Sequence, residues 1–185
     1  MRILVVTGTP GTGKTTIAEN AAMMLKGARI VHINDLVKEK RLYTSRSKKD
    51  GALVVDMRRL KQELGRVVRE QGCRILILEG HVLCDLRVRG AIAVVVREHL
   101  SVLLKRMRRR GYGPEKIMDN LVCEATDYCG IKALANYSRV YELMGGNGAP
   151  RTVADIAEGK RVKLAGIELL HELEPLLEVN RSVLP

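Results

Sequence analysis

A glycine-rich segment near the N-terminus has the residue types and spacing of a phosphate-binding loop. Residues 8–15, GTPGTGKT, fit the pattern G-x-x-x-x-G-K-[ST] and directly follow the apolar run ILVV, which is typical of a buried strand. Glycines let successive backbone N–H groups turn toward phosphate oxygens, and the following helix presents its positive end to the same anion. This context predicts a P-loop that binds a nucleoside triphosphate, and a ligand-free glycine-rich turn is the alternative.

The polar residues of this loop have distinct expected roles. Lys14 is expected to reach the β- and γ-phosphates. The hydroxyl of Thr15 is expected to hold Mg²⁺, because magnesium binds few protein oxygens and keeps waters beside the substrate phosphates. Thr16 would add a contact at the start of the helix. The predicted nucleotide-binding residues of the loop are Gly8, Gly11, Thr12, Gly13, Lys14, Thr15 and Thr16.

An acid and a histidine follow a second apolar run. Residues 74–78, RILIL, read as a central strand of a parallel sheet covered on both faces, and Glu79 and His81 come directly after it. The carboxyl ends of such strands face the ligand crevice, so both side chains are expected where the P-loop opens. The unperturbed pKa of histidine lies close to neutrality, which would allow His81 to act as a donor or a base. A buried structural role for His81 remains the alternative.

Composition limits the domain count and the partners. The chain of 185 residues is long enough for one domain with one core. Its 32 Lys and Arg against 21 Asp and Glu give a formal charge of +11, which favours polyanionic partners. These are nucleotides alone, or nucleotides together with RNA or an RNA-bound complex. Trp and Phe are absent, which argues against reading single-stranded nucleic acid on aromatic platforms.

The cysteines and the hydropathy pattern bear on the compartment. Cys73, Cys84, Cys123 and Cys129 form no C-x-x-C pair and have no histidines at zinc-like spacing, so we expect reduced packing residues. No secretory leader precedes the first strand, and no apolar run approaches the length of a membrane span. These features predict a soluble, cytoplasmic protein without a membrane partner.

Alternating strand and helix patterns are expected to position the candidate residues. The apolar periodicity predicts strands at 29–33, 53–55, 74–78, 91–96 and 139–143, and helices at 14–25, 57–72, 98–109, from 115 and from 152. Thr152 and Asp155 have the spacing of a capping box, and Glu124 is expected on the outer face of its helix. This order, with right-handed crossovers, predicts a three-layer α/β domain around a parallel sheet.

Two basic segments allow either of two interpretations. Residues 34–50 are polar, carry several Lys and Arg, and are expected to form a mobile excursion from the core. Residues 105–110 place basic side chains at a helix C-terminus, where they suit the helix dipole. Each segment is either a solvated basic surface or a phosphate-binding one.

Taken together, these features resemble the nucleoside monophosphate kinases. More narrowly, the chain resembles the atypical adenylate kinases that double as ribosome-assembly ATPases. The resemblance covers most of the chain up to Tyr137. The residues that carry it are Thr7-Gly8-Thr9-Pro10-Gly11, Gly13-Lys14-Thr15-Thr16, Asp35-Leu36, Leu42-Tyr43, Asp56, Arg59, His81, Arg110-Gly111-Tyr112, Asp119-Asn120 and Cys123-Glu124.

The resemblance implies a single P-loop kinase domain over residues 1–185, with a monophosphate-binding segment at 34–54 and a short lid at 109–119. It implies that Arg110 reaches the triphosphate and that Asn147 and Gly148 lie along the adenine. Glu79 would hold Mg²⁺ through water, and His81 would serve phosphoryl transfer or position a water. The catalytic residues implied are Lys14, Glu79, His81 and Arg110, and the substrate-binding residues are Asp35, Lys38, Val54 and Arg59.

Two residues depart from the family pattern. The family usually carries Asp where this chain has Glu79, and Arg where it has Lys38. A longer acid can still reach a metal-bound water, whereas Lys38 is a point charge that cannot grip a phosphate with two parallel hydrogen bonds. AMP binding is therefore less firmly expected than ATP binding.

The resemblance implies Mg²⁺-dependent transfer from ATP to AMP, with ATPase activity and a role in maturation of the small ribosomal subunit. Its implied partners are a small-subunit ribosomal protein and rRNA. A short lid, which excludes water poorly, favours some hydrolysis beside transfer. The alternatives are an assembly ATPase with little kinase activity and a kinase of another small molecule or of nucleic acid.

Overall fold

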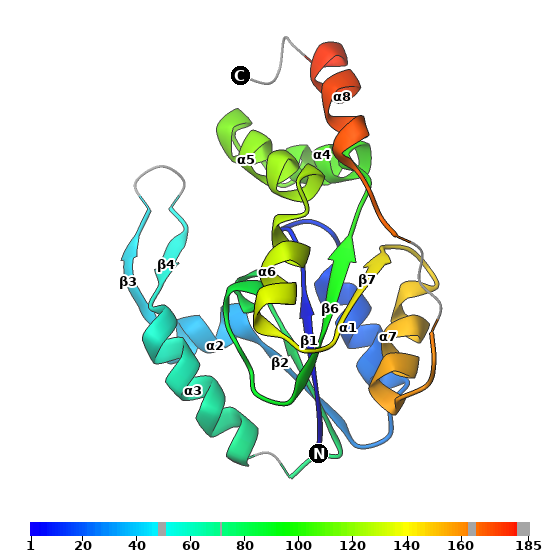
Figure 1. The fold of residues 1–185 in the computed structure, drawn as a ribbon. Coiled ribbons are helices and arrows are strands. Elements are labelled where there is room, and N and C mark those ends of the chain that lie inside the picture. Colours follow the sequence, from blue (N-terminus) through cyan, green and yellow to red (C-terminus); the bar gives the residue numbers. More distant parts are fainter. Residues whose placement is uncertain (48–50, 71, 163–165, 181–185) are drawn as a thin grey trace.

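The computed structural model describes residues 1–47, 51–70, 72–162 and 166–180. Within these residues, the central sheet has five strands. Their order is β2 (Ala28–His32), β5 (Ile75–Glu79), β1 (Arg2–Thr7), β6 (Ala91–Arg97) and β7 (Val140–Met144). Every neighbouring pair runs parallel (Figure 1). The predicted α/β architecture, a three-layer P-loop fold around a parallel central sheet, is confirmed.

Helices cover both faces of this sheet. α1 (Lys14–Met23) and α7 (Ala149–Glu158) pack on one face, against Leu4 and Val6 of β1. The other face packs through Ile3 and Val5, because successive side chains of a strand point to opposite sides. That face meets α2 (Ile33–Glu39), α3 (Met57–Glu70), the 3₁₀ helix η1 (His81–Asp85) and α6 (Tyr128–Asn136). Burial on both faces explains the continuous apolar runs of β5 and β6.

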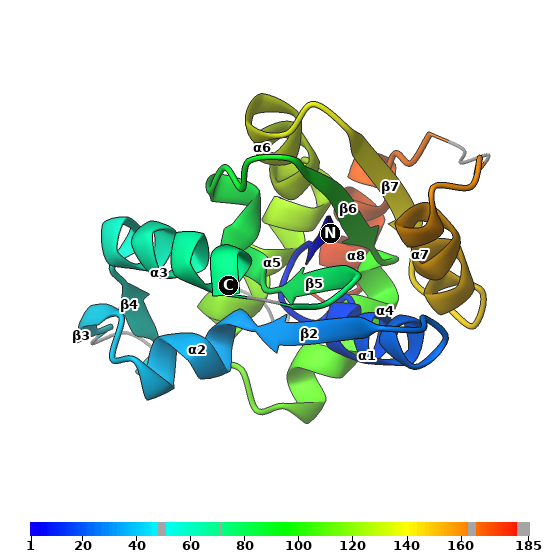
Figure 2. The same cartoon turned by 90° about the horizontal axis from the view of Figure 1, so that it is seen from below.

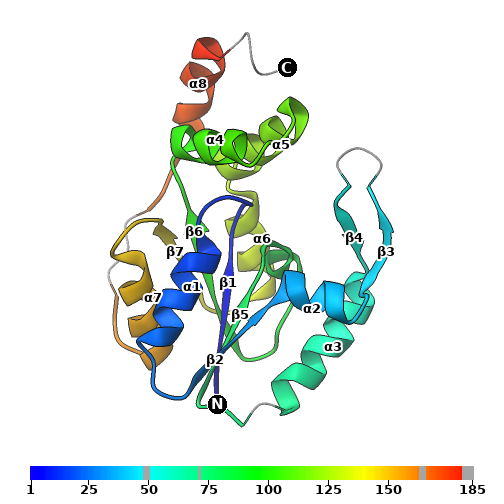
Figure 3. The ribbon, with the colours of Figure 1, turned by 180° about the vertical axis from the view of Figure 1, so that it is seen from behind.

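A separate helical layer lies beyond the carboxyl ends of the central strands. α4 (Leu100–Arg109), α5 (Pro114–Ala125), the 3₁₀ turn η2 (Leu170–Glu172) and α8 (Leu173–Val179) come together there (Figure 3). Leu100, Leu103, Met107, Ile117 and Leu121 form its buried apolar cluster. This layer places the basic end of α4 beside the P-loop.

The segment at 34–54 contains more regular structure than the sequence predicted. It includes most of α2, the strand β3 (Tyr43–Arg46) and part of β4 (Leu53–Val55), which pairs with β3 in an antiparallel ladder. Leu36, Val37 and Leu42 are buried in the same core as Leu60, so a few apolar residues anchor α2 and the turn that follows it. Figure 2 shows α2, α3 and the β3–β4 ladder grouped at one side of the molecule, opposite α7. Residues 48–50 lie outside the described part of the chain.

Three local expectations need correction. α7 begins at Ala149 with proline in its first turn, so Thr152 lies inside the helix and its hydroxyl donates to the Gly148 carbonyl instead of capping. Glu124 is 1% exposed and faces inward from α5. The helix α6 was not predicted at all.

Among the helices of the described residues, none is long and apolar enough to cross a membrane.

Candidate active site

The P-loop lies between β1 and α1, in the context that its motif requires. Gly8, Gly11 and Gly13 all have positive φ angles, of 142°, 100° and 90°. At Gly8 a Cβ atom would lie 2.3 Å from the Val96 carbonyl oxygen of the neighbouring strand, so only glycine fits there. The loop therefore turns tightly over the end of the sheet and leads into the N-terminus of α1.

Lys14 lies at the start of α1 and is buried. Its ammonium donates a hydrogen bond to the Thr9 carbonyl at 3.3 Å. Burial lowers the pKa of Lys14, and the nearby carboxylate of Glu79 opposes this shift. A bound triphosphate would supply further negative charge beside this ammonium, so the residue fits its predicted role.

Glu79 and Thr15 lie together at the mouth of the loop. The Thr15 hydroxyl donates to Glu79 Oε1 at 3.1 Å, and Glu79 is buried at the end of β5. A hydroxyl and a carboxylate side by side form a hard oxygen donor set, which suits Mg²⁺. The residues present therefore fit the predicted ion, with Thr15 as a ligand and Glu79 acting directly or through water.

His32 is a site residue that sequence reasoning missed. It ends β2 in register with Glu79, and its Nδ1 lies 3.0 Å from Glu79 Oε2. Its Nε2 lies 3.4 Å from Glu19 Oε1, so the ring bridges two carboxylates. The sequence placed it inside a predicted strand at 29–33, and the pairing of that strand with β5 was not visible.

His81 follows Glu79 by two residues and begins η1. Its backbone carbonyl accepts a hydrogen bond from the Thr7 hydroxyl at 3.0 Å, which anchors it to the end of β1. Burial and the positive charge of Lys14 lower the pKa of His81 to about 4. This lowering of the pKa was not expected from the sequence, and it keeps the imidazole neutral at pH 7.

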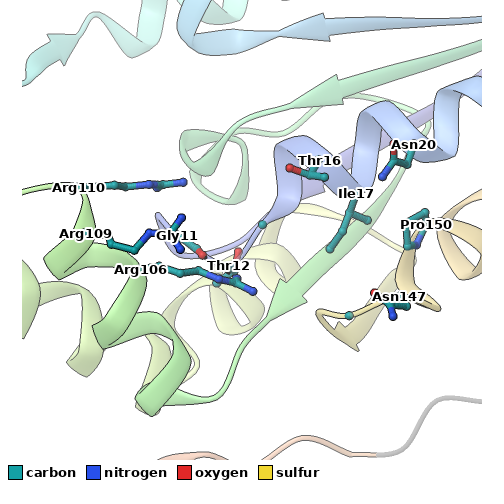
Figure 4. A pocket seen from close by; sticks show the side chains of 12 residues that line it. Gly11, Thr12, Thr16, Ile17, Asn20, Arg106, Arg109, Arg110, Asn147 and Pro150 are labelled. Carbon is teal, nitrogen blue, oxygen red and sulfur yellow. Dashed lines mark hydrogen bonds between the residues drawn. The ribbon is translucent and has the colours of Figure 1, made fainter.

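A pocket of about 580 Å³ lies over the P-loop and the first turns of α1 (Figure 4). The ends of the basic side chains from α4 lie on one side of it, and Asn147 and Pro150 lie on the other. Gly148 lines a neighbouring cavity together with Asn147. The residues that line the pocket over the P-loop are Gly11, Thr12, Gly13, Thr16, Ile17, Asn20, Arg106, Arg109, Arg110, Gly146, Asn147 and Pro150.

The arginines of this pocket extend the predicted set. Arg110, which was predicted to reach the triphosphate, is the C-cap residue of α4 and lines this pocket. Arg106 and Arg109 join it, although the sequence suggested only a general basic cluster. Arg106 Nη1 donates to the Gly11 carbonyl at 3.0 Å and lies 2.9 Å from Glu98 Oε2. Their spacing of three and four residues on one helix face could have identified them.

The predicted acceptor residues lie in a different part of the molecule. Asp35 and Lys38 are exposed on α2, with Lys38 Nζ 3.9 Å from Asp35 Oδ1. Val54 is exposed on β4, and Arg59 is exposed on α3, where it donates to the Arg41 carbonyl at 3.1 Å. All four residues thus belong to the side of the molecule that holds α2, α3 and the β3–β4 ladder.

Fold and site together define a P-loop kinase. The family model described as "AAA domain" matches residues 4–127. A protein of Methanosarcina acetivorans named "Putative adenylate kinase" is 33% identical over 159 residues, which are 82% of each chain. A protein of the same name from Methanocaldococcus jannaschii is 32% identical over 143 residues, 77% of this chain and 76% of its own. The chain belongs to this adenylate-kinase-like family of P-loop proteins.

Solved structures agree on the fold. The shikimate kinase of Bacteroides thetaiotaomicron aligns with a TM-score of 0.57 over 96% of this chain and 98% of its own, at 18% identity. The tunicamycin resistance protein of Deinococcus radiodurans aligns with a TM-score of 0.57 over 90% of this chain and 99% of its own, at 19% identity. At these identities the likeness concerns the fold alone. The family and the fold support a phosphotransferase of the nucleoside monophosphate kinase type.

Proposed function

We propose that the protein is an adenylate kinase, which transfers the γ-phosphoryl group of ATP to AMP and forms two ADP. The observation that carries the proposal is that Lys14 and the Thr15–Glu79 pair lie at the end of the P-loop, while Arg106, Arg109 and Arg110 line the pocket over the same loop. AMP is proposed as the acceptor because the relatives at about 30% identity are named adenylate kinases. In this proposal residues 1–185 form one kinase domain.

The side chains would act mainly by positioning and charge neutralisation. An oxygen of the AMP phosphate attacks the γ-phosphorus of ATP, and the bond from that phosphorus to the β–γ bridging oxygen breaks, so that ADP leaves. Lys14 and Arg110 would neutralise negative charge on the transferred group, which is worth most in a site shielded from water. Mg²⁺, held by Thr15 and by Glu79 through water, would neutralise phosphate charge. The neutral His81 would hold a hydrogen bond at the γ-phosphate.

The proposed substrate sites lie on different elements. The triphosphate would occupy the pocket over α1, with its adenine toward Asn147 and Gly148. AMP would bind the segment 34–54 through Asp35, Lys38 and Val54, with Arg59 from α3. Residues 109–119 would form the lid, which comprises the end of α4, a short turn and the start of α5.

A second activity, slow ATP hydrolysis, is favoured by the exposure of this site. Thr15, Thr16, Arg109 and Arg110 are all exposed, so water reaches the phosphate-binding residues when the acceptor is absent. A role in maturation of the small ribosomal subunit rests on the family resemblance and on the formal charge of +11, which suits an rRNA-containing partner.

An acceptor panel tests the kinase proposal. ADP formation from Mg²⁺-ATP would be measured alone and with AMP, CMP, UMP, GMP or shikimate. We expect AMP to raise the rate at least about tenfold, because a bound acceptor oxygen replaces a weakly held water. A rate raised only by another acceptor would contradict the adenylate kinase assignment.

A further inference from the structure

The P-loop is joined to α5 by a buried side-chain hydrogen bond. The hydroxyl of Thr9 donates to Oε2 of Glu124, which lies near the C-terminal end of α5. Thr9 and Glu124 are each 1% exposed, so water does not compete for this bond. A carboxylate acceptor makes it a charge-assisted bond, stronger than one between neutral groups.

The other oxygen of Glu124 is fixed by the end of β6. Oε1 accepts from Arg97 Nε at 3.0 Å and from the Glu98 backbone N–H at 2.9 Å. Arg97 also donates to the Glu124 backbone carbonyl at 2.7 Å, so it holds both the side chain and the main chain of this residue. The buried carboxylate therefore has a buried cation and a rigid strand end beside it, and it cannot turn away from Thr9 without leaving these donors unpaired.

Thr9 in turn organises the rest of the loop. Its backbone carbonyl accepts from Lys14 Nζ at 3.3 Å, from the Thr12 N–H at 3.3 Å and from the Thr12 hydroxyl at 3.1 Å. The orientation of Thr9 thus sets where the ammonium of Lys14 and the turn at Thr12 lie. The loop also lies close to α4, because a Cβ at Gly11 would lie 2.8 Å from Leu103 Cδ1.

We infer that Glu124 is a positioning residue for triphosphate binding, which acts through Thr9 on the P-loop and on Lys14. Glu124 is not among the residues that line the pocket over the loop, and Arg97, which also pairs with Asp127 and Glu142, lies 3.0 Å from its Oε1. The inference rests on the proposed function only to the extent that the loop binds a triphosphate. It also connects the loop to α5, the helix whose first residues belong to the proposed lid.

Isosteric substitution of Thr9 tests this inference. Thr9→Val keeps the side-chain volume and removes the donor, whereas Thr9→Ser keeps the hydroxyl. The dissociation constants of a fluorescent ATP analogue and of AMP would be measured for each variant at a temperature well below unfolding. Each nucleotide would be titrated alone, without the other present. We expect Thr9→Val to weaken binding of the ATP analogue about tenfold, with AMP binding unchanged and with Thr9→Ser within about twofold of the original protein.

A matched control separates positioning from a general loss of stability. Thr126→Val removes an exposed hydroxyl at the C-cap of α5, which donates to the Val122 carbonyl at 2.7 Å and not to a residue of the P-loop. It should leave both dissociation constants unchanged. Thr9→Ala serves as the second variant if Thr9→Val fails to fold, and the same weakening is expected. ATP-analogue affinity within twofold of the original in the folded donor-less variant would overturn the inference, as would equal weakening for AMP.

This experiment does not depend on the identity of the acceptor. A protein that binds the ATP analogue but fails to phosphorylate AMP contradicts the proposed function and leaves the expected effect of Thr9→Val in place. The converse result is that the original protein phosphorylates AMP while Thr9→Val binds the ATP analogue with unchanged affinity. That result contradicts the positioning role of Glu124 and leaves the proposed function in place.

Discussion

The hydroxyl of Thr15 lies 3.1 Å from Oε1 of Glu79, which joins the first turn of α1 to the carboxyl end of β5. His32 holds the other carboxylate oxygen from the neighbouring strand, at 3.0 Å. Glu79 is one methylene longer than the aspartate usual at this position in the resembled family. Its longer side chain is thus held on two sides, which keeps the carboxylate beside the residue proposed to bind Mg²⁺.

Substitution of Glu79 should affect the metal requirement more than nucleotide binding. We expect Glu79→Gln to raise the Mg²⁺ concentration for half-maximal ADP formation by about tenfold, because a charged partner of the ion is lost. ATP binding measured without Mg²⁺ should stay within about twofold. Glu70→Gln, at the exposed end of α3, serves as the charge-matched control. Unchanged metal dependence with lost ATP affinity would make Glu79 a structural residue.

Removal of the P-loop cation should abolish turnover. Lys14→Ala keeps the backbone amides of the loop but loses the ammonium that neutralises charge on the transferred group, and we expect ADP formation to fall by at least about 100-fold. Lys26→Ala, at an exposed position after α1, should retain normal activity. Initial rates at saturating ATP and AMP provide the measurement, and near-normal activity of Lys14→Ala would contradict the assignment of the P-loop.

The low pKa of His81 predicts a loss of stability in acid. Unfolded His81 takes up a proton near its ordinary pKa of 6.5, but in the folded protein burial and Lys14 lower that pKa to about 4. The unfolded state binds more protons between these values, so the free energy of unfolding falls as pH falls through this window. The contribution of His81 is roughly 2 to 3 kcal/mol between pH 7.5 and pH 4.5.

Urea unfolding at these two pH values measures this effect. His81→Gln, which does not titrate, should lose about 2 kcal/mol less than the original protein between the two conditions. His171→Gln, at an exposed position, should behave like the original protein. An equal acid-induced loss in His81→Gln and in the original protein would show that His81 is not held neutral by its surroundings.

The proposed acceptor site can be tested by strengthening it. Lys38→Arg replaces a point charge by a planar fork that can grip a phosphate with two hydrogen bonds. We expect the Michaelis constant for AMP to fall about threefold while that for ATP stays constant. Lys40→Arg, on the same exposed segment, is the control. If the constants for both nucleotides change equally, the segment serves another substrate.

Sequence patterns predicted the parts of this fold that depend on local spacing. The P-loop, the buried strands at 74–78 and 91–96 and the helix that follows residue 57 all have strong periodicity or a defined motif, and the structure places each within a few residues of its predicted bounds. Glu79 and His81 could be placed near the P-loop because parallel strands end at a common edge.

The residues that were missed depend on packing between distant segments. His32 becomes a partner of Glu79 only because β2 pairs with β5, a neighbour relation that periodicity does not contain. Glu124 was expected outside because charged residues are rarely buried unless paired, and its partners Thr9 and Arg97 lie far away in the sequence. The helix and strands within residues 34–47 and 51–54 depend on three buried apolar side chains among many charges, a signal too weak to distinguish from that of a loop.

The most direct test of the central claim follows the transferred atom itself. The protein would be incubated with Mg²⁺ and ATP labelled with ³²P at the γ-position, with and without AMP, and the label in ADP and in inorganic phosphate would be separated. We predict that with AMP most of the label appears in ADP, and that it appears slowly in inorganic phosphate when AMP is absent. Label that appears only in inorganic phosphate, at a rate that AMP does not change, would contradict the proposed phosphoryl transfer.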